Sequence, residues 1–110
     1  MAAGILIDLQ PNETILKDGP ANHFKGVEAV GGRLFLTNQR VFFKSHAFNV
    51  QNHSLSIPLD SIQSMGKRNT LLLVPNGMYI ETVTGEREKF VIWGRGDWIA
   101  KTMQQKEKNL

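Results

Sequence analysis

Three histidines are the residues of this chain that could bind a metal or transfer protons. They are His23, His46 and His53, and the last two could face each other across the segment HAFNVQNH. A protein metal site usually needs three or four ligands, and no carboxylate lies between these two to complete one. The pattern therefore favours structural or solvated histidines, and no metal site is expected.

Paired carboxylates occur at Glu86 and Glu88, next to Arg87 and Lys89. Alternating charges of this kind are typical of a solvated turn and not of an acid–base dyad. The chain has no cysteine, which excludes thiolate catalysis, thiolate metal ligands and disulfides. It also lacks the G-x-S-x-G, P-loop and H-E-x-x-H patterns. We therefore expect no enzyme activity, no catalytic residue and no cofactor.

Cations beside aromatic rings offer a different chemistry, which is the binding of anions or partner surfaces. They gather in the stretch GGRLFLTNQRVFF, residues 31–43, where two apolar runs flank four polar residues. This pattern is typical of a β-hairpin. With Asn38 and Gln39 at its tip, the predicted cross-strand pairs are Leu36 with Val41, Phe35 with Phe42, and Leu34 with Phe43. Because partners share a face, the face formed by Leu34, Leu36, Val41 and Phe43 is wholly apolar and is predicted to be core.

The opposite face of the hairpin places Phe35 beside Phe42, with Arg33, Arg40 and Lys44 around them. Two aromatic rings surrounded by cations could insert at an anionic membrane surface or hold a protein partner. Alternatively, the N-terminal segment, a C-terminal helix or a second protomer covers the rings, and the cations form a solvated rim.

Lys67 and Arg68, in SMGKRNT, form the one compact basic loop that the sequence predicts. If this loop meets Arg33, Arg40 and Lys44, the cations would bind phosphate through point charge and the bidentate guanidinium fork. The alternative is a turn that is basic for solubility. The candidate ligand- or partner-binding residues are Arg33, Phe35, Arg40, Phe42, Lys44, Lys67 and Arg68.

The chain that must position these residues is short and of ordinary composition. Its 110 residues, 41% apolar and 21% charged, fit one globular domain over residues 1–110. The net charge of +3 is modest, so a slightly basic soluble domain is favoured over a nucleic-acid-binding one. No apolar run reaches the roughly 18 residues of a membrane span, and the N-terminus lacks the basic region of a signal peptide. We expect a cytoplasmic protein that can associate peripherally with a membrane.

Glycine and asparagine recur between short β-rich segments, which is typical of an antiparallel meander of hairpins. Strands are predicted at Glu13–Lys17, Lys25–Ala29, Arg33–Thr37, Val41–Ser45, Ser54–Pro58, Thr70–Val74, Met78–Val83 and Lys89–Trp93. Asn76-Gly77 predicts a type I′ turn and Gly85 a second turn. Residues 71–93 are therefore expected to form a three-stranded meander.

The end of the chain, GRGDWIAKTMQQKEKNL, is rich in helix formers. It predicts an amphipathic helix over residues 97–108 with Asp97 as its N-cap. Trp98, Ile99 and Met103 can share one face, and Trp98 is expected to pack on the sheet. Many strands followed by one helix indicate a mainly β, α+β fold in which the helix closes a bent antiparallel barrel.

The hairpin resembles the core signature of the GRAM domain family, G-x-L-Y-L-T-x-x-R-x-x-F-x-S. The matching residues are Gly32, Leu34, Phe35, Leu36, Thr37, Arg40, Phe43 and Ser45, with Phe35 in the usual tyrosine place. ETILKDGPA, from Glu13, resembles the opening strand of the family, and LSIPLDSIQSM resembles its I-P-L-x-x-I segment. GMYIETVTGEREKFVIWG resembles its later strands, so the resemblance spans roughly Glu13 to Trp98.

The resemblance implies a pleckstrin-homology-like fold, with a C-terminal amphipathic helix closing one end of the barrel. It also implies a non-catalytic module that binds a membrane surface or anionic lipid headgroups, often phosphoinositides. Val27 stands where lipid-binding relatives of this fold often carry a cation, so a specific phosphoinositide pocket is not expected. The alternative is a protein-interaction or self-association module, whose partner is a protein or a second copy of the chain. Single-stranded nucleic-acid binding is the weakest alternative.

Overall fold

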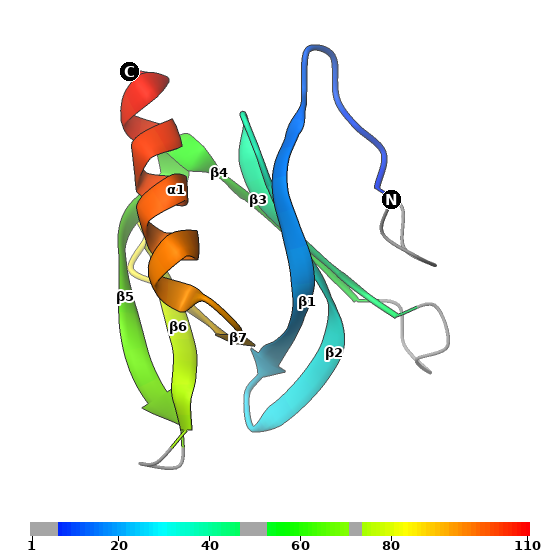
Figure 1. Ribbon diagram of the computed structural model, residues 1–110, viewed down its shortest axis with the longest axis vertical. Helices are drawn as coiled ribbons and strands as arrows, with labels where there is room; N and C mark the ends of the chain where they lie inside the picture. Colours follow the sequence, from blue (N-terminus) through cyan, green and yellow to red (C-terminus); the bar gives the residue numbers. More distant parts are fainter. Residues whose placement is uncertain (1–6, 47–52, 71–73) are drawn as a thin grey trace.

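The computed structural model describes residues 7–46, 53–70 and 74–110 (Figure 1). Its strands are β1 (Ile15–Lys25), β2 (Glu28–Thr37), β3 (Arg40–Ser45), β4 (Ser54–Pro58), β5 (Ile62–Thr70), β6 (Val74–Thr82) and β7 (Arg87–Ile92). A 3₁₀ turn, η1 (Leu59–Ser61), precedes β5, and the helix α1 (Arg95–Lys108) follows β7. The seven strands form one antiparallel sheet in the order β4-β3-β2-β1-β7-β6-β5. The predicted mainly β class with one C-terminal helix is confirmed.

The sheet bends back on itself, and its two edge strands are connected directly. β4 ends at Pro58, and η1 leads into β5 within three residues. The Leu59 N–H donates to the Gln39 carbonyl at 3.0 Å, which fixes this corner against the β2–β3 turn. In Figure 1, α1 lies along β5 and β6, on the side that faces β1.

The interior is filled by side chains that point inward from the strands and from α1. The cross-strand pairs predicted for the hairpin are confirmed: Leu34 with Phe43, Phe35 with Phe42, and Leu36 with Val41. The four side chains of the predicted core face all belong to the buried core. Trp98 is 2% exposed and belongs to the same core, so the expected packing of this ring is also confirmed.

The first hairpin differs from the prediction. Strands are predicted at Glu13–Lys17 and Lys25–Ala29, whereas β1 is one long strand that ends in a two-residue turn at Gly26 and Val27. Gly26 has a φ of 63°, and glycine is the residue that accepts this value at the first position of such a turn. Pro20 lies inside β1, where it is tolerated because β7 pairs with β1 only at Ala21–His23.

The turn predicted at Asn76-Gly77 is wrong. Gly77 lies inside β6, between Arg68 of β5 and Val91 of β7. A Cβ atom at position 77 would lie 2.3 Å from the Arg68 carbonyl oxygen. Glycine is therefore needed here because the backbones of β5 and β6 approach closely, and not because a turn requires a positive φ.

The predicted three-stranded meander exists, but it begins at Ile62 and not at residue 71. Most of β5 is missed because IQSMGKRNT has little apolar alternation. The predicted strand Thr70–Val74 falls largely on residues 71–73, which lie outside the described residues. The turn at Gly85 is confirmed, since Gly85 has a φ of 92° and its N–H donates to the Thr82 carbonyl at 2.9 Å.

The helix begins two residues before its predicted N-cap. α1 starts at Arg95, after Gly94, which has a φ of 72° and no side chain to cap the helix. Asp97 lies in the first turn and accepts a hydrogen bond from Lys17 Nζ at 2.8 Å. This bond lowers the pKa of the Asp97 carboxyl and ties β1 to α1. Among the residues described, no helix is long and apolar enough to cross a membrane.

Candidate functional site

The aromatic face predicted on the β2–β3 hairpin lies on the outer side of the sheet, away from the core. Phe35 is only 2% exposed, whereas Phe42 is half-buried. The Arg40 guanidinium lies over the Phe42 ring, with its carbon 4.5 Å from the ring centroid. Arg40 Nη2 also donates to the Asp8 carbonyl at 3.0 Å. The N-terminal segment therefore reaches this face, and the Phe35 ring is not part of the surface.

A buried carboxylate holds Arg40 in place. Arg40 Nε donates to Glu13 Oε2 at 2.7 Å and Nη2 to Oε1 at 3.1 Å, and the Thr37 hydroxyl donates to Oε2 at 2.7 Å. Burial alone would raise the pKa of the Glu13 carboxyl. The hydrogen bonds from Arg40, from a backbone amide and from Thr37, with the Arg40 charge, outweigh it and lower that pKa from 4.5 to about 2. The Arg40 charge is thus compensated inside the protein.

The polar tip of the hairpin is anchored by hydrogen bonds to the segment before β1. Asn38 accepts from the Thr14 N–H at 2.7 Å and donates to the Asn12 carbonyl at 2.9 Å. Gln39 donates from its side chain to the Pro11 carbonyl at 2.8 Å. The residues TNQR of the signature therefore build a corner of the fold, which explains why the signature identifies the fold better than a ligand.

Arg33 and Lys44 lie opposite each other on β2 and β3 and share the outer face. Arg33 Nη2 donates to Asp18 Oδ1 of β1 at 2.9 Å, whereas the Lys44 side chain is exposed. Asp18 therefore compensates the Arg33 charge inside the protein.

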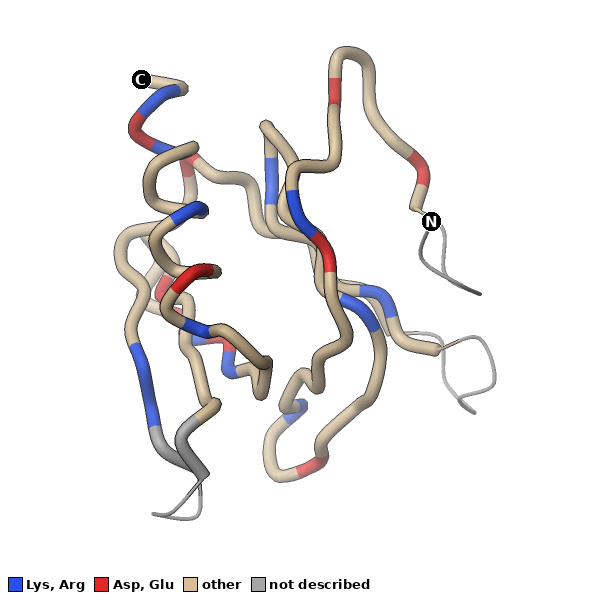
Figure 2. The backbone as a smooth tube through the Cα atoms, viewed as in Figure 1, with Lys and Arg blue, Asp and Glu red and all other residues tan. Residues whose placement is uncertain are grey.

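Lys67 and Arg68 belong to the edge strand β5, so the prediction of a basic loop is wrong. Both are exposed, and within the described part of the chain neither pairs with a carboxylate. β5 lies at the far end of the strand order from β2 and β3. Figure 2 shows the cations of β5 and those of the β2–β3 hairpin on different sides of the molecule. The seven candidate residues therefore do not form one site.

Two residues that the sequence does not identify as candidates lie at the junction of β7 and α1. Trp93 follows β7 and is 80% exposed. Arg95 donates from Nη1 to the carbonyls of Arg68 at 3.0 Å and of Gly77 at 3.1 Å, which ties the start of α1 to β5 and β6. We call this surface the β5–α1 patch. It consists of Arg68, Trp93 and Arg95, with Lys67 at the edge of β5, where its side chain turns toward the start of α1 near Gly96.

The period-2 alternation of β7 is the signal that could have identified Trp93. Phe90 and Ile92 are buried in the core, so Val91 and Trp93 point to the other face. Val91 pairs with Gly77, and Gly77 pairs with Arg68. Because cross-strand partners share a face, Val91 and Arg68 lie on the same outer face, about 10 Å apart across two strand spacings. Trp93 follows Val91 by two residues toward this face.

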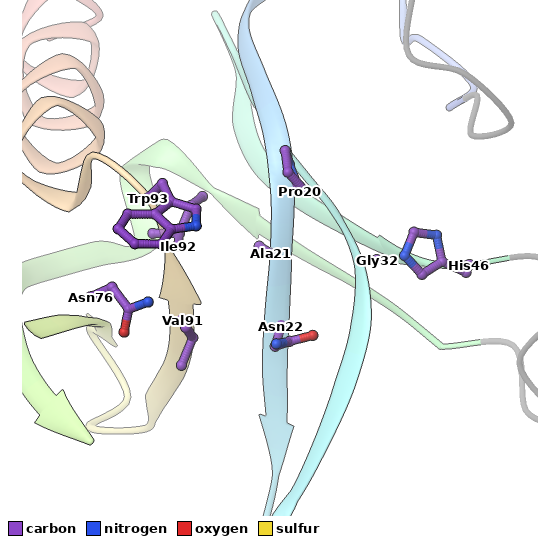
Figure 3. Close-up of a pocket in the computed structure, with 9 residues that line it drawn as sticks. All are labelled: Pro20, Ala21, Asn22, Gly32, His46, Asn76, Val91, Ile92 and Trp93. Atoms are coloured by element: carbon purple, nitrogen blue, oxygen red, sulfur yellow. The ribbon is translucent and has the colours of Figure 1, made fainter. Parts of the chain in front are cut away.

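A hollow of about 230 Å³ lies beside Trp93 (Figure 3). Its lining residues are Pro20, Ala21, Asn22, Gly32, His46, Asn76, Val91, Ile92 and Trp93. In Figure 3, Trp93 and Asn76 lie on one side, and the Asn22 side chain points toward His46 on the other. Asn76 Oδ1 is buried and has no hydrogen-bond partner among the described residues.

His23, His53 and Glu88 form a hydrogen-bonded chain in the interior. His23 Nδ1 lies 2.7 Å from His53 Nε2, and His23 Nε2 lies 2.8 Å from Glu88 Oε1. Burial lowers the pKa of the His53 imidazole, and the charges of His23 and Lys25 lower it further. The structure therefore places His53 against His23, whereas the sequence raised His46 as a residue that could face it. The described ranges contain no group of three potential ligands that could hold a metal ion.

Comparison with known proteins identifies the fold and the family. A search of curated proteins finds no match. Among solved structures, the C-terminal domain of an unknown protein from Leishmania infantum is similar, with a TM-score of 0.75 and 21% identity over 87% of this chain and 86% of that one. The Vps36 N-terminal PH domain has a TM-score of 0.74 and 18% identity over 97% and 89%.

A third solved structure, the Slm1-PH domain in complex with phosphoserine, has a TM-score of 0.65 and 12% identity over 84% of this chain and 96% of that one. These similarities confirm the pleckstrin-homology-like fold that the resemblance implies. The sequence profile described as the GRAM domain matches residues 3–97. The chain therefore belongs to the GRAM domain family.

Proposed function

We propose that this chain is a non-catalytic binding module that docks peripherally on anionic membrane surfaces through the β5–α1 patch. GRAM and pleckstrin-homology-like domains are typically lipid- or protein-binding modules. One observation carries the membrane proposal, which is the 80% exposed ring of Trp93 on the same outer face as the exposed cation Arg68, with the exposed Lys67 next to Arg68 on the edge strand β5. In the described part of the chain, no carboxylate pairs with either cation.

Tryptophan and basic side chains suit the two layers of a membrane surface. Trp93 can place its ring at the boundary between headgroups and acyl chains while its N–H contacts water. Lys67 and Arg68 would contact lipid phosphates, and each cation near an anionic surface contributes about 1 kcal/mol. The whole chain has a net charge of only +3, so this affinity depends on a local patch. The phosphoserine bound by the Slm1-PH domain supports a phosphate group as a ligand for this fold.

Vesicle flotation tests the proposal. The chain is mixed with vesicles of phosphatidylcholine alone or of phosphatidylcholine with phosphatidylserine, at about 0.1 M and about 1 M salt. We expect flotation with the anionic vesicles at the lower salt, and loss of most of it at the higher salt because surface charges are screened. Absence of flotation with either vesicle, or equal flotation with both, would contradict the proposal.

Two variants, each with a matched control, locate the contact. K67E/R68E should abolish flotation, and K101E/K108E, which changes the net charge equally but alters the middle and the C-terminal end of α1, should retain it. Trp93→Ala should weaken flotation, whereas Val83→Ala should not. Val83 is a suitable control because it is 60% exposed but lies next to Ser61, at the opposite end of β5 from Arg68. Equal effects of both charge reversals would show attraction by net charge and not by this patch.

A further inference from the structure

Strand β1 is paired along only part of its second side. It pairs with β2 along its whole length, but with β7 only from Ala21 to His23. Alternate residues of an antiparallel strand direct their N–H and C=O groups to opposite sides. The stretch from Ile15 to Gly19 therefore presents backbone groups that have no neighbouring strand in the described part of the chain. Such an edge is a template for an additional strand.

A cavity of about 290 Å³ lies along this unpaired edge, between β1 and α1. Its lining residues are Leu16, Leu36, Lys101, Gln104, Gln105 and Lys108. Leu36 is 1% exposed and forms an apolar floor, whereas Leu16 is 47% exposed. The register shifts between Ile15 and Lys17, so Leu16 is the extra residue of a β-bulge, a feature that re-aims a side chain. Figure 1 shows α1 running beside this part of β1.

The helix side of the cavity is basic and able to form hydrogen bonds. Its four residues from α1 follow the spacing i, i+3, i+4 and i+7, which places them on one helix face. They carry two ammonium groups and two amides, and none of the lining residues carries a carboxylate. Asp97, which lies 3.8 Å from Lys101, is also held by Lys17 at 2.8 Å. The groove therefore complements a ligand with negative charge.

We propose that the groove between β1 and α1 binds an extended acidic segment of a partner protein. The segment adds as a strand to the free edge of β1, places an apolar side chain against Leu16 and Leu36, and directs carboxylates to Lys101 and Lys108. Main-chain hydrogen bonds give affinity in this mode of recognition, and the alternate side chains give specificity. The site is separate from the β5–α1 patch and does not depend on membrane binding.

Fluorescence anisotropy with the full chain tests this site. The probe is a short fluorescein-labelled peptide of alternating glutamate and valine, and the control peptide has lysine in place of glutamate. We expect the acidic peptide to bind and the basic one not to bind. K101E/K108E should weaken binding at least about tenfold, whereas K67E/R68E should leave it unchanged. The milder variant K101Q/K108Q, which keeps helix-forming residues, should weaken binding in the same direction.

Amide chemical shifts locate the bound peptide. Addition of the acidic peptide should shift the amides of residues 15–19 and of Lys101 and Lys108. Equal binding of both peptides, shifts confined to β5, or unchanged binding to K101E/K108E would overturn the proposal. Oleate that shifts the same amides while the acidic peptide does not would assign the groove to an acyl ligand and also overturn it. Failure of flotation alone would contradict only the membrane proposal, because K67E/R68E separates the two sites.

Discussion

The Glu13 carboxylate and the Arg40 guanidinium form a two-point contact between the segment before β1 and the β2–β3 turn. The two hydrogen bonds measure 2.7 Å and 3.1 Å, and the Glu13 side chain is fully buried. Arg87 and Glu81 form a pair with the same 2.7 Å distance, but the Arg87 side chain is 51% exposed. The protein therefore contains a buried and an exposed ion pair of similar geometry.

Arg40→Met should lower the free energy of unfolding by about 3–5 kcal/mol, because it leaves the Glu13 carboxylate buried without its partner. Arg87→Met should lower it much less, because the Glu81 carboxylate can be hydrated. Urea denaturation monitored by circular dichroism measures both values. Similar losses in the two variants would show that burial does not set the contribution of the Glu13–Arg40 pair.

Stability should fall on acidification between pH 4.5 and pH 2, partly because of Glu13. Its pKa is lowered from 4.5 to about 2 in the folded state, so the unfolded chain takes up the proton first as the pH falls. The contribution of the ionised Glu13 carboxylate to the free energy of unfolding is complete above pH 4.5 and amounts to about 3 kcal/mol. The stability difference between the wild type and Glu13→Gln, measured by denaturation at several pH values, should shrink toward pH 2. A constant difference would contradict the lowered pKa.

A second pH effect is expected from His53. Because its pKa in the folded state is below the ordinary value of 6.5, the unfolded chain binds more protons as the pH falls through this range. The contribution of the His53 imidazole to the free energy of unfolding is complete above pH 6.5 and decreases below it. The wild type should therefore lose more stability than His53→Gln between pH 7.5 and pH 5. Parallel losses would argue against this role, and NMR titration of the His53 ring gives an independent measurement.

Gly77→Ala should destabilise the protein by about 1–3 kcal/mol. The added Cβ would lie 2.3 Å from the backbone carbonyl oxygen of Arg68, which cannot move without disturbing the β5–β6 pairing. Gly96→Ala is the matched control, since the nearest atoms to its Cβ belong to Lys67 at 3.9 Å. It should be neutral or stabilising by up to about 1 kcal/mol. Thermal denaturation distinguishes the two, and a neutral Gly77→Ala variant would contradict the close approach.

Tryptophan fluorescence should report membrane docking directly. Trp93 is 80% exposed and Trp98 is 2% exposed, so only Trp93 can move from water to an apolar environment. Phosphatidylserine-containing vesicles should shift the emission to shorter wavelength, and Trp93→Phe should remove this shift. A shift that persists in Trp93→Phe would show that the core around Trp98 rearranges instead.

The register of the β2–β3 hairpin could be predicted because local features determine it. Apolar alternation and a short polar tip fix which side chains of such a hairpin share a face. β5 could not be predicted in the same way, because the register shifts between Ile62 and Ser64 and interrupts the period-2 pattern. The Asn76-Gly77 turn was mispredicted because glycine also serves close approach, which residue type alone cannot distinguish from a turn.

For the candidate site, the sequence predicts which residue types are present but not how they are arranged. The sequence indicates which cations exist, but not which are compensated by a carboxylate. Arg40 meets Glu13, which lies 27 residues away in the chain, and Arg33 of β2 meets Asp18 of the neighbouring strand β1. The pairing therefore depends on strand register between distant segments. Trp93 was missed for a related reason, since its exposure depends on where β7 ends and α1 begins.

The pairing of β1 with β7 also affects how the protein folds. His23 pairs with Phe90, and Lys17 contacts Asp97 at 2.8 Å, so part of the second side of β1 meets segments from the far end of the described chain. Contacts of such high sequence separation slow folding, because a long loop must close before they form. We expect folding in milliseconds to seconds, with β1 left half-paired on a ribosome until β7 and α1 have emerged.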